Sequence, residues 1–320
     1  MITSVGRRAR SRRRAASTTA RAASMTGGQR RLVAVFLLPA FAYYAVFFLG
    51  PALATVWISL TTWSGLGSDI TFVGLSNYIG MFQDPMFWLS FGNTLQILVV
   101  VGVSVFAMSF FFMAVLREMK GRQFIRAVIF FPSVVAPVAL AIAWGFVFDP
   151  QAGLVNALLR IVGLGTIQPV WLGPDLILKS VMAGLIWINV GFFATILLSA
   201  VDRIPATYYE ASALEGASEL QKFIHVTLPM TWDVLSIAAV LWVISAIKVF
   251  EFIYAFGATS GAPPTSLWTS AIFMYMVTLG NRSPIYKLGY GSAIAVAMVV
   301  LTAVLVLLIR RVLRREAIEF

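Results

Sequence analysis

The chain has 320 residues, of which 60% are hydrophobic and only 12% are charged, and its mean hydropathy is +0.89. A soluble domain of this size needs a charged, solvated surface, so this composition excludes an ordinary soluble protein. The chain has no cysteine and one histidine, His225. Disulfides, thiol nucleophiles, Cys-ligated metals and relays through several histidines are therefore excluded.

The net charge of +11 is concentrated near the two ends of the chain. Nine arginines lie within residues 1–31, without any Asp or Glu, and four more lie within residues 310–315. Basic clusters beside membrane helices set topology and favour anionic lipid headgroups. The tail has no aromatic residue for base stacking, so we expect no nucleic-acid partner. We interpret residues 1–30 as a basic, mostly disordered tail and residues 31–320 as a transmembrane domain.

Apolar stretches recur at the length that crosses about 30 Å of hydrocarbon, and they predict an all-α polytopic membrane protein. The first stretch is too long for a single crossing and contains two prolines, which predicts tilt, a kink or an extension beyond the bilayer. The third also contains two prolines. Six spans are predicted, at about residues 32–62, 91–116, 124–148, 176–201, 232–256 and 288–313.

The distribution of basic residues predicts the orientation of these spans. Both termini and the loops after spans two and four carry 19 Lys and Arg, whereas the opposite loops carry four. Positive residues accumulate on the cytoplasmic side, so both termini are expected in the cytoplasm.

The segment between spans four and five, residues 203–229, is the most informative part of the sequence. Residues 206–214 are mostly good helix formers. Gly216 can end or bend this helix, and Ser218 can cap a second short helix that runs to about His225. An amphipathic element joined to two spans suits docking into a groove of a soluble partner. The alternative is a helix that lies on the membrane surface without a partner.

The spacing of residues within this segment is specific. Glu210-Ala211, Gly216 and Leu228-Pro229 stand at the positions of the EAA loop, which the segment resembles. This loop is found in binding-protein-dependent ABC importer permeases. The departures from the family pattern are small: Ser212 for Ala, Glu215 for Asp and Val226 for Ile.

The resemblance covers most of the chain after the tail. It points to permeases of the maltose and glycerol-3-phosphate type, which take up carbohydrates. The segments that carry it are residues 72–78, 87–95, 144–156, 248–263 and 289–293.

The resemblance implies a machine of several subunits in the cytoplasmic membrane of a bacterium. A second permease completes the pathway, two copies of a cytosolic ATPase drive it, and an extracytoplasmic binding protein delivers the solute. The chain has no phosphate-binding loop of the Gly-x-x-x-x-Gly-Lys-Ser/Thr type, so it is predicted not to be an enzyme. No cofactor is expected on this chain, and ATP and magnesium are expected in the partner ATPase.

The resemblance also implies which residues couple the permease to the ATPase. Glu210 would accept a charge-assisted hydrogen bond from the partner, and Gly216 would permit a sharp turn or close packing. The coupling residues are Tyr209, Glu210, Ala211, Leu214, Glu215, Gly216, Ala217, Phe223, Leu228 and Pro229.

Polar side chains within the spans are candidates for contact with the solute. Lys248 and Glu251 lie at i and i+3 of span five, which puts them on one face of a helix. They are expected either to line a polar pathway or to form a local ion pair with Lys248 reaching outward. Asn189 either bonds a solute hydroxyl or ties two helices together. Tyr254 either stacks on a sugar ring or packs in the protein.

Other classes of function fit the sequence less well. A secondary transporter needs carboxylates near mid-membrane, and Glu251 lies near one end of its span. An intramembrane enzyme needs a paired acid and base or a metal cluster. A scaffold that only docks a cytosolic partner is the structural alternative. The expected solute is an uncharged sugar, with glycerol-3-phosphate or a polyol as the alternative.

Overall fold

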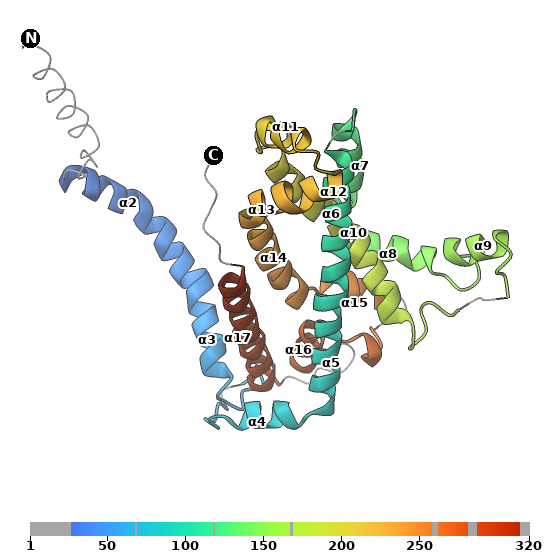
Figure 1. Cartoon of the computed structure of the whole chain (residues 1–320). Coiled ribbons are helices and arrows are strands. Elements are labelled where there is room, and N and C mark those ends of the chain that lie inside the picture. The colour runs from blue at the N-terminus through green and yellow to red at the C-terminus, as the bar shows by residue number, and fades with distance from the viewer. Residues whose placement is uncertain are drawn as a thin grey trace, which may run out of the picture. The chain divides into compact units, whose positions relative to one another are not determined.

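A computed structural model describes residues 27–67, 69–117, 119–166, 169–257, 262–280 and 287–313 (Figure 1). The chain divides into two compact units, Met1–Ala54 and Thr55–Phe320. The predicted disordered tail lies outside the described residues up to position 26, and helix begins at Gly27. Arg314 and Arg315 also lie outside them.

The first unit is one apolar helical segment. It consists of α2 (Gly27–Tyr44), the π-helix η1 (Ala45–Leu49) and the start of α3 (Gly50–Ile58). Pro51 cannot donate to the carbonyl four residues before it, and its ring would collide with that carbonyl in a regular helix. The wider π turn directly before Pro51 relieves this conflict. Pro39 lies within α2, so both prolines of the first span stand in a continuous helical segment.

Most of the predicted spans in the second unit are present. Span two consists of α5 (Pro85–Gln96), the π-helix η2 (Ile97–Val101) and α6 (Gly102–Leu116). It begins six residues earlier than predicted, because the Asp84 side chain caps the helix by accepting from the Met86 amide at 2.8 Å. The remaining spans are α10 (Ile177–Val201), α14 (Trp232–Ile247) with α15 (Glu251–Gly257), and α17 (Leu288–Val312).

The third predicted span, which contains two prolines, consists of two helices. α7 (Arg122–Val134) and α8 (Pro137–Val147) are bent by 98° at their junction. A residue before proline avoids the helical region, and Ala136 is accordingly extended, with φ −55° and ψ 128°. Pro137 then begins the second helix. Within the described residues, five helices are long and apolar enough to cross a membrane, and the bent pair makes six if it is one span.

Among the described residues, three short helices were not predicted. They are α4 (Ser76–Gln83), α9 (Leu154–Ile161) and α16 (Ser270–Thr278), and the 3₁₀ turn η5 (Thr265–Leu267) precedes α16. α9 is held by its buried Asn156, which accepts from the Trp171 indole at 2.8 Å. This contact lies outside the span pattern, so hydropathy gave no signal for it.

The helices of the second unit cross closely where glycine replaces a side chain. A Cβ at Gly191 of α10 would overlap the carbonyl oxygen of Ile129 in α7. A Cβ at Gly102 would overlap the indole of Trp242, whose Nε1 donates to the Leu98 carbonyl at 2.9 Å. Small residues at such crossings let helix backbones approach, as is common in membrane proteins.

The segment 203–229, here called the coupling loop, lies at one end of the second unit, and α4 lies at the other (Figure 1). It contains α11 (Ala206–Leu214), α12 (Glu219–Lys222), the π-helix η3 (Phe223–Thr227) and the start of α13 (Leu228–Met230).

Candidate coupling surface and pathway cavity

The turn between the two helices of the coupling loop has the geometry that the sequence predicted. α11 ends at Leu214, and Gly216 follows with φ +79°. The Gly216 amide donates to the Ala213 carbonyl and the Ala217 amide donates to the Ser212 carbonyl, both at 3.0 Å. This is a Schellman motif, which requires the left-handed conformation that glycine adopts without strain.

The second helix begins as its sequence predicted. The Ser218 hydroxyl accepts from the Gln221 amide at 3.4 Å, and the Gln221 side chain accepts from the Ser218 amide at 2.8 Å. The two bonds form a capping box. Lys222 bonds the Glu219 carboxylate at 2.6 Å, and this hydrogen bond lowers the pKa of Glu219. The two helices therefore meet at a fixed turn.

Tyr209 anchors α11 to the rest of the unit. Its side chain is buried, and its hydroxyl lies 3.0 Å from the Thr227 hydroxyl. The guanidinium carbon of Arg117 lies 3.2 Å from the centre of the Tyr209 ring. Tyr209 thus positions α11 through contacts inside the protein, although it was predicted among the residues that meet a partner.

Apart from the buried Tyr209, the predicted coupling residues divide into an exposed set and a half-buried set. Leu214 is 91% exposed, a large apolar side chain that nothing in the described chain covers. By contrast, Phe223 is half-buried and its ring packs edge-on against Phe110, with centroids 6.3 Å apart. The exposed set is Glu210, Ala211, Leu214, Glu215 and Gly216, and the half-buried set is Ala217, Phe223, Leu228 and Pro229.

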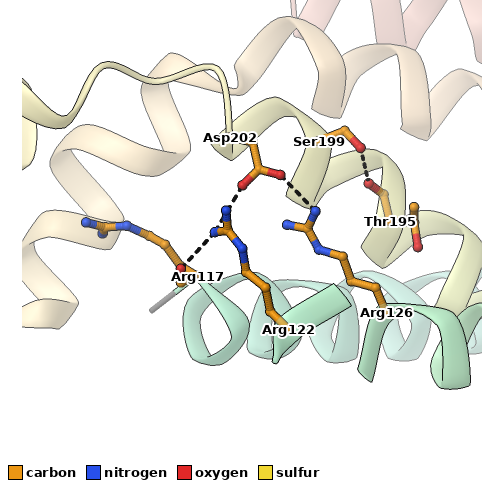
Figure 2. Close-up of polar contacts among 6 residues, drawn as sticks. All are labelled: Arg117, Arg122, Arg126, Thr195, Ser199 and Asp202. Carbon is orange, nitrogen blue, oxygen red and sulfur yellow. Dashed lines mark hydrogen bonds and ion pairs between the residues drawn. The ribbon is translucent and has the colours of Figure 1, made fainter. Parts of the chain in front are cut away.

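A cluster of charged residues lies where α10 meets the coupling loop (Figure 2). The Asp202 carboxylate contacts Arg126 Nη1 at 2.8 Å and Arg122 Nη1 at 3.2 Å, using one oxygen for each. Arg122 Nη1 also donates to the Arg117 carbonyl at 3.0 Å. Sequence reasoning missed this cluster. The available signal was opposite charges at the same predicted ends of neighbouring spans three and four.

A cavity of about 300 Å³ lies among the spans of the second unit. It is bordered at three places by irregular backbone: Ile97 in η2, Pro137 at the start of α8, and residues 248–250 between α14 and α15. Irregular backbone at membrane depth is tolerated where it lines a cavity or is buried in protein. Its lining includes the predicted pathway residues Asn189, Lys248 and Glu251.

Lys248 and Glu251 do not share one helical face, contrary to the prediction. α14 ends at Ile247, Lys248 has φ −93° and ψ 2°, and Glu251 begins α15. Both side chains are exposed, and the described residues contain no ion pair between them. The break brings both residues to the same cavity by a different geometry.

The other two pathway candidates have partners within the protein. Asn189 Nδ2 donates to the Leu185 carbonyl of its own helix at 2.8 Å, while the residue still borders the cavity. The Tyr254 ring stacks on Phe250 with centroids 5.1 Å apart and meets Tyr275 edge-on at 5.4 Å. Tyr254 packs in an aromatic group beside the cavity lining.

Helices long and apolar enough to cross a membrane mark a polytopic membrane protein, and a cavity edged by broken helices is typical of transporters. The chain belongs to the family of binding-protein-dependent transport system inner membrane components, whose model matches residues 111–317. The predicted family is thereby confirmed.

Individual relatives agree with this assignment. The chain is 32% identical over 278 residues to the probable ABC transporter permease protein YurN of Bacillus subtilis, covering 86% of this chain and 93% of the relative. It is 32% identical to the trehalose/maltose transport system permease protein MalF of Thermococcus litoralis, covering 87% and 91%. It is 30% identical to the sn-glycerol-3-phosphate transport system permease protein UgpA of Yersinia pestis, covering 75% and 80%.

The fold is also that of a solved transporter. A bacterial ABC transporter involved in the import of the acidic polysaccharide alginate contains a chain that matches with a TM-score of 0.76 at 21% identity. The match covers 90% of this chain and 96% of the other. The predicted all-α, multi-pass permease fold is confirmed.

Proposed function

We propose that this chain is one of two permease subunits of an ATP-driven importer and that its coupling loop docks a cytosolic ABC ATPase. The observation that carries the proposal is the division of α11 into two faces. Tyr209 fixes one face to the protein, whereas Glu210 and Leu214 on the other are exposed. An exposed apolar side chain beside a carboxylate on a rigid helix suits a groove of a soluble partner.

The solute is proposed to be a neutral sugar or sugar-like molecule. The charged residues that border the cavity are Lys248 and Glu251, so the described lining has no excess of positive charge for a phosphate. Relatives named for trehalose/maltose and diacetylchitobiose support this class. Glycerol-3-phosphate or a polyol is the alternative, which the relative named for sn-glycerol-3-phosphate supports.

The remaining parts of the machine lie in other chains. ATP and magnesium are proposed to bind the partner ATPase, present in two copies, and no cofactor is proposed for this chain. An extracytoplasmic binding protein is proposed to deliver the solute, and a solved neighbour is a transporter in complex with an alginate pentasaccharide-bound periplasmic protein. Both termini are proposed to lie in the cytoplasm, with the coupling loop on the same side.

The proposal is tested by isolating this chain, tagged, from mild-detergent extracts of its native membranes and identifying the retained proteins by mass spectrometry. Recovery of a second permease, an ATPase with a phosphate-binding loop and a binding protein is expected. The binding protein is then screened against sugars and polyols. Recovery of the chain alone, even after crosslinking, would refute the importer. An assembled complex that moves no solute in liposomes would favour a scaffold.

A further inference from the structure

Helices α7 and α10 are joined at three levels along their length. At the end beside the coupling loop, Asp202 pairs with Arg122 and Arg126 (Figure 2). Further along, Gly191 lets the backbone of α7 approach so closely that a Cβ would overlap a carbonyl oxygen. Near the far end of α7, the Ser133 hydroxyl donates to the Ile188 carbonyl at 2.7 Å. Contacts at all three levels make the two helices a rigid pair.

The charged cluster also leads directly into the coupling loop. Asp202 caps the end of α10, and three residues separate it from α11. This connection is held to the helix, because the Arg203 and Ile204 amides donate to carbonyls in the last turn of α10 at 3.1 and 3.0 Å. The Ile204 side chain is buried. When α11 moves, this short connection therefore moves Asp202 with it.

The charge of Arg126 is balanced by the Asp202 carboxylate. Its side chain is only 18% exposed, and its Nε and Nη2 atoms are buried without a hydrogen-bond partner. Among the described residues, Asp202 is the one acidic side chain paired with it. A largely buried cation that loses its counter-ion is unfavourable, so the Asp202 charge contributes to the tie between α7 and α10.

The other end of this helix pair borders the cavity. α10 contributes Ile188 and Asn189 to the lining, and Pro137 follows α7 across the bent junction. If α7 and α10 move together relative to α14 and α15, the cavity therefore changes on two of its sides.

Resting on the proposed function, we propose that Asp202 is a positioning residue that couples the loop to the pathway. Through Arg122 and Arg126 it makes α7 follow α10 when a docked ATPase moves α11. The pair then carries this movement to the cavity. Asp202 itself contacts neither solute nor ATPase in this mechanism.

The test measures distances between spin labels in the complex purified through this chain and embedded in lipid nanodiscs. Because the chain has no cysteine, two introduced cysteines are its only labelling sites. A joint pair, Gln123→Cys on α7 and Ser199→Cys on α10, reports on the charged cluster. A cavity pair, Ala139→Cys on α8 and Ile237→Cys on α14, lies outside the lining but on two of the helices that border the cavity. Each is measured at rest and after trapping with ATP and vanadate.

In the unmodified chain, trapping is expected to shift the cavity distance and to leave the joint distance unchanged. In Asp202→Asn, the joint distance should broaden, and the share of molecules reaching the trapped cavity distance should fall by about twofold or more. The ATPase should stay bound. Asp202→Glu, which keeps the charge, should recover the shift. Asp233→Asn, which removes an exposed acid at the start of α14, is the matched control and should behave as the unmodified chain.

A full cavity shift in Asp202→Asn, with the ATPase bound, would overturn this role of Asp202 and leave the proposed function standing. A joint distance that changes in the unmodified chain would overturn the rigid pair. Absence of the ATPase from the unmodified complex would overturn the proposed function and this inference with it. If Asp202→Asn fails to assemble, Arg122→Gln removes the more exposed of the two ion pairs, and a smaller reduction of the shift is expected. A full shift in Arg122→Gln would count against the role.

Discussion

Gly216 offers the sharpest test of the coupling loop, because its surroundings separate two reasons for a glycine. Its φ of +79° is left-handed, but a Cβ there would meet no atom of this chain within 4 Å. Within the permease alone, a substitution therefore causes backbone strain without collision. For a residue with a Cβ this strain is roughly 1–2 kcal/mol, a change of about 5- to 30-fold in the population of the intact turn.

A series of three variants distinguishes strain from loss of docking. Gly216→Ala should show the full strain, whereas Gly216→Asn should show less, because asparagine tolerates the left-handed region. Gly216→Asp has nearly the shape of Gly216→Asn and adds a charge. All three should insert normally into the membrane, and Gly216→Asp should lose most of the bound ATPase, because the added charge would be buried in the docked groove.

The assay is quantitative copurification of the ATPase with the tagged permease, together with ATP-driven uptake in liposomes. Thermal stability of the isolated permease is the control for folding, and it should change little in each variant, since the strain is confined to an exposed turn. Normal uptake and a normal amount of ATPase in Gly216→Asp would refute the docking role of this loop.

Three further predictions concern helix packing, the anchor of α11 and the cavity. Gly191→Ala should destabilise the complex by about 1–3 kcal/mol, because the new Cβ meets the backbone of Ile129; an unchanged melting temperature would contradict the close crossing. Tyr209→Phe removes the hydroxyl contact with Thr227 and should weaken ATPase binding by about 1 kcal/mol at equal expression; binding as tight as in the unmodified chain would show that this contact does not hold α11. Lys248→Gln should raise the KM for uptake of the identified solute by about tenfold while ATPase copurification stays normal, and an unchanged KM would remove Lys248 from the pathway.

Much of the secondary structure followed from local sequence. The ends of spans four, five and six were predicted to within one residue, because the length of an apolar run decides whether it crosses a membrane. The bounds of α11, the turn at Gly216 and the cap at Ser218 were also predicted. These features depend on propensity, backbone conformation and capping within a few residues.

The sequence by itself therefore determined the class of protein, the ends of spans four to six and the helix–turn–helix of its coupling loop, while the tertiary structure decided where helices break and which side chains meet. Tyr209 is buried because Thr227 and Arg117 fold against it, and Asp202 is paired because α7 lies beside α10. The break after Ile247 brings Lys248 and Glu251 to one cavity without a shared helical face. Partners distant in the chain make these contacts, and neither hydropathy nor local propensity carries information about them.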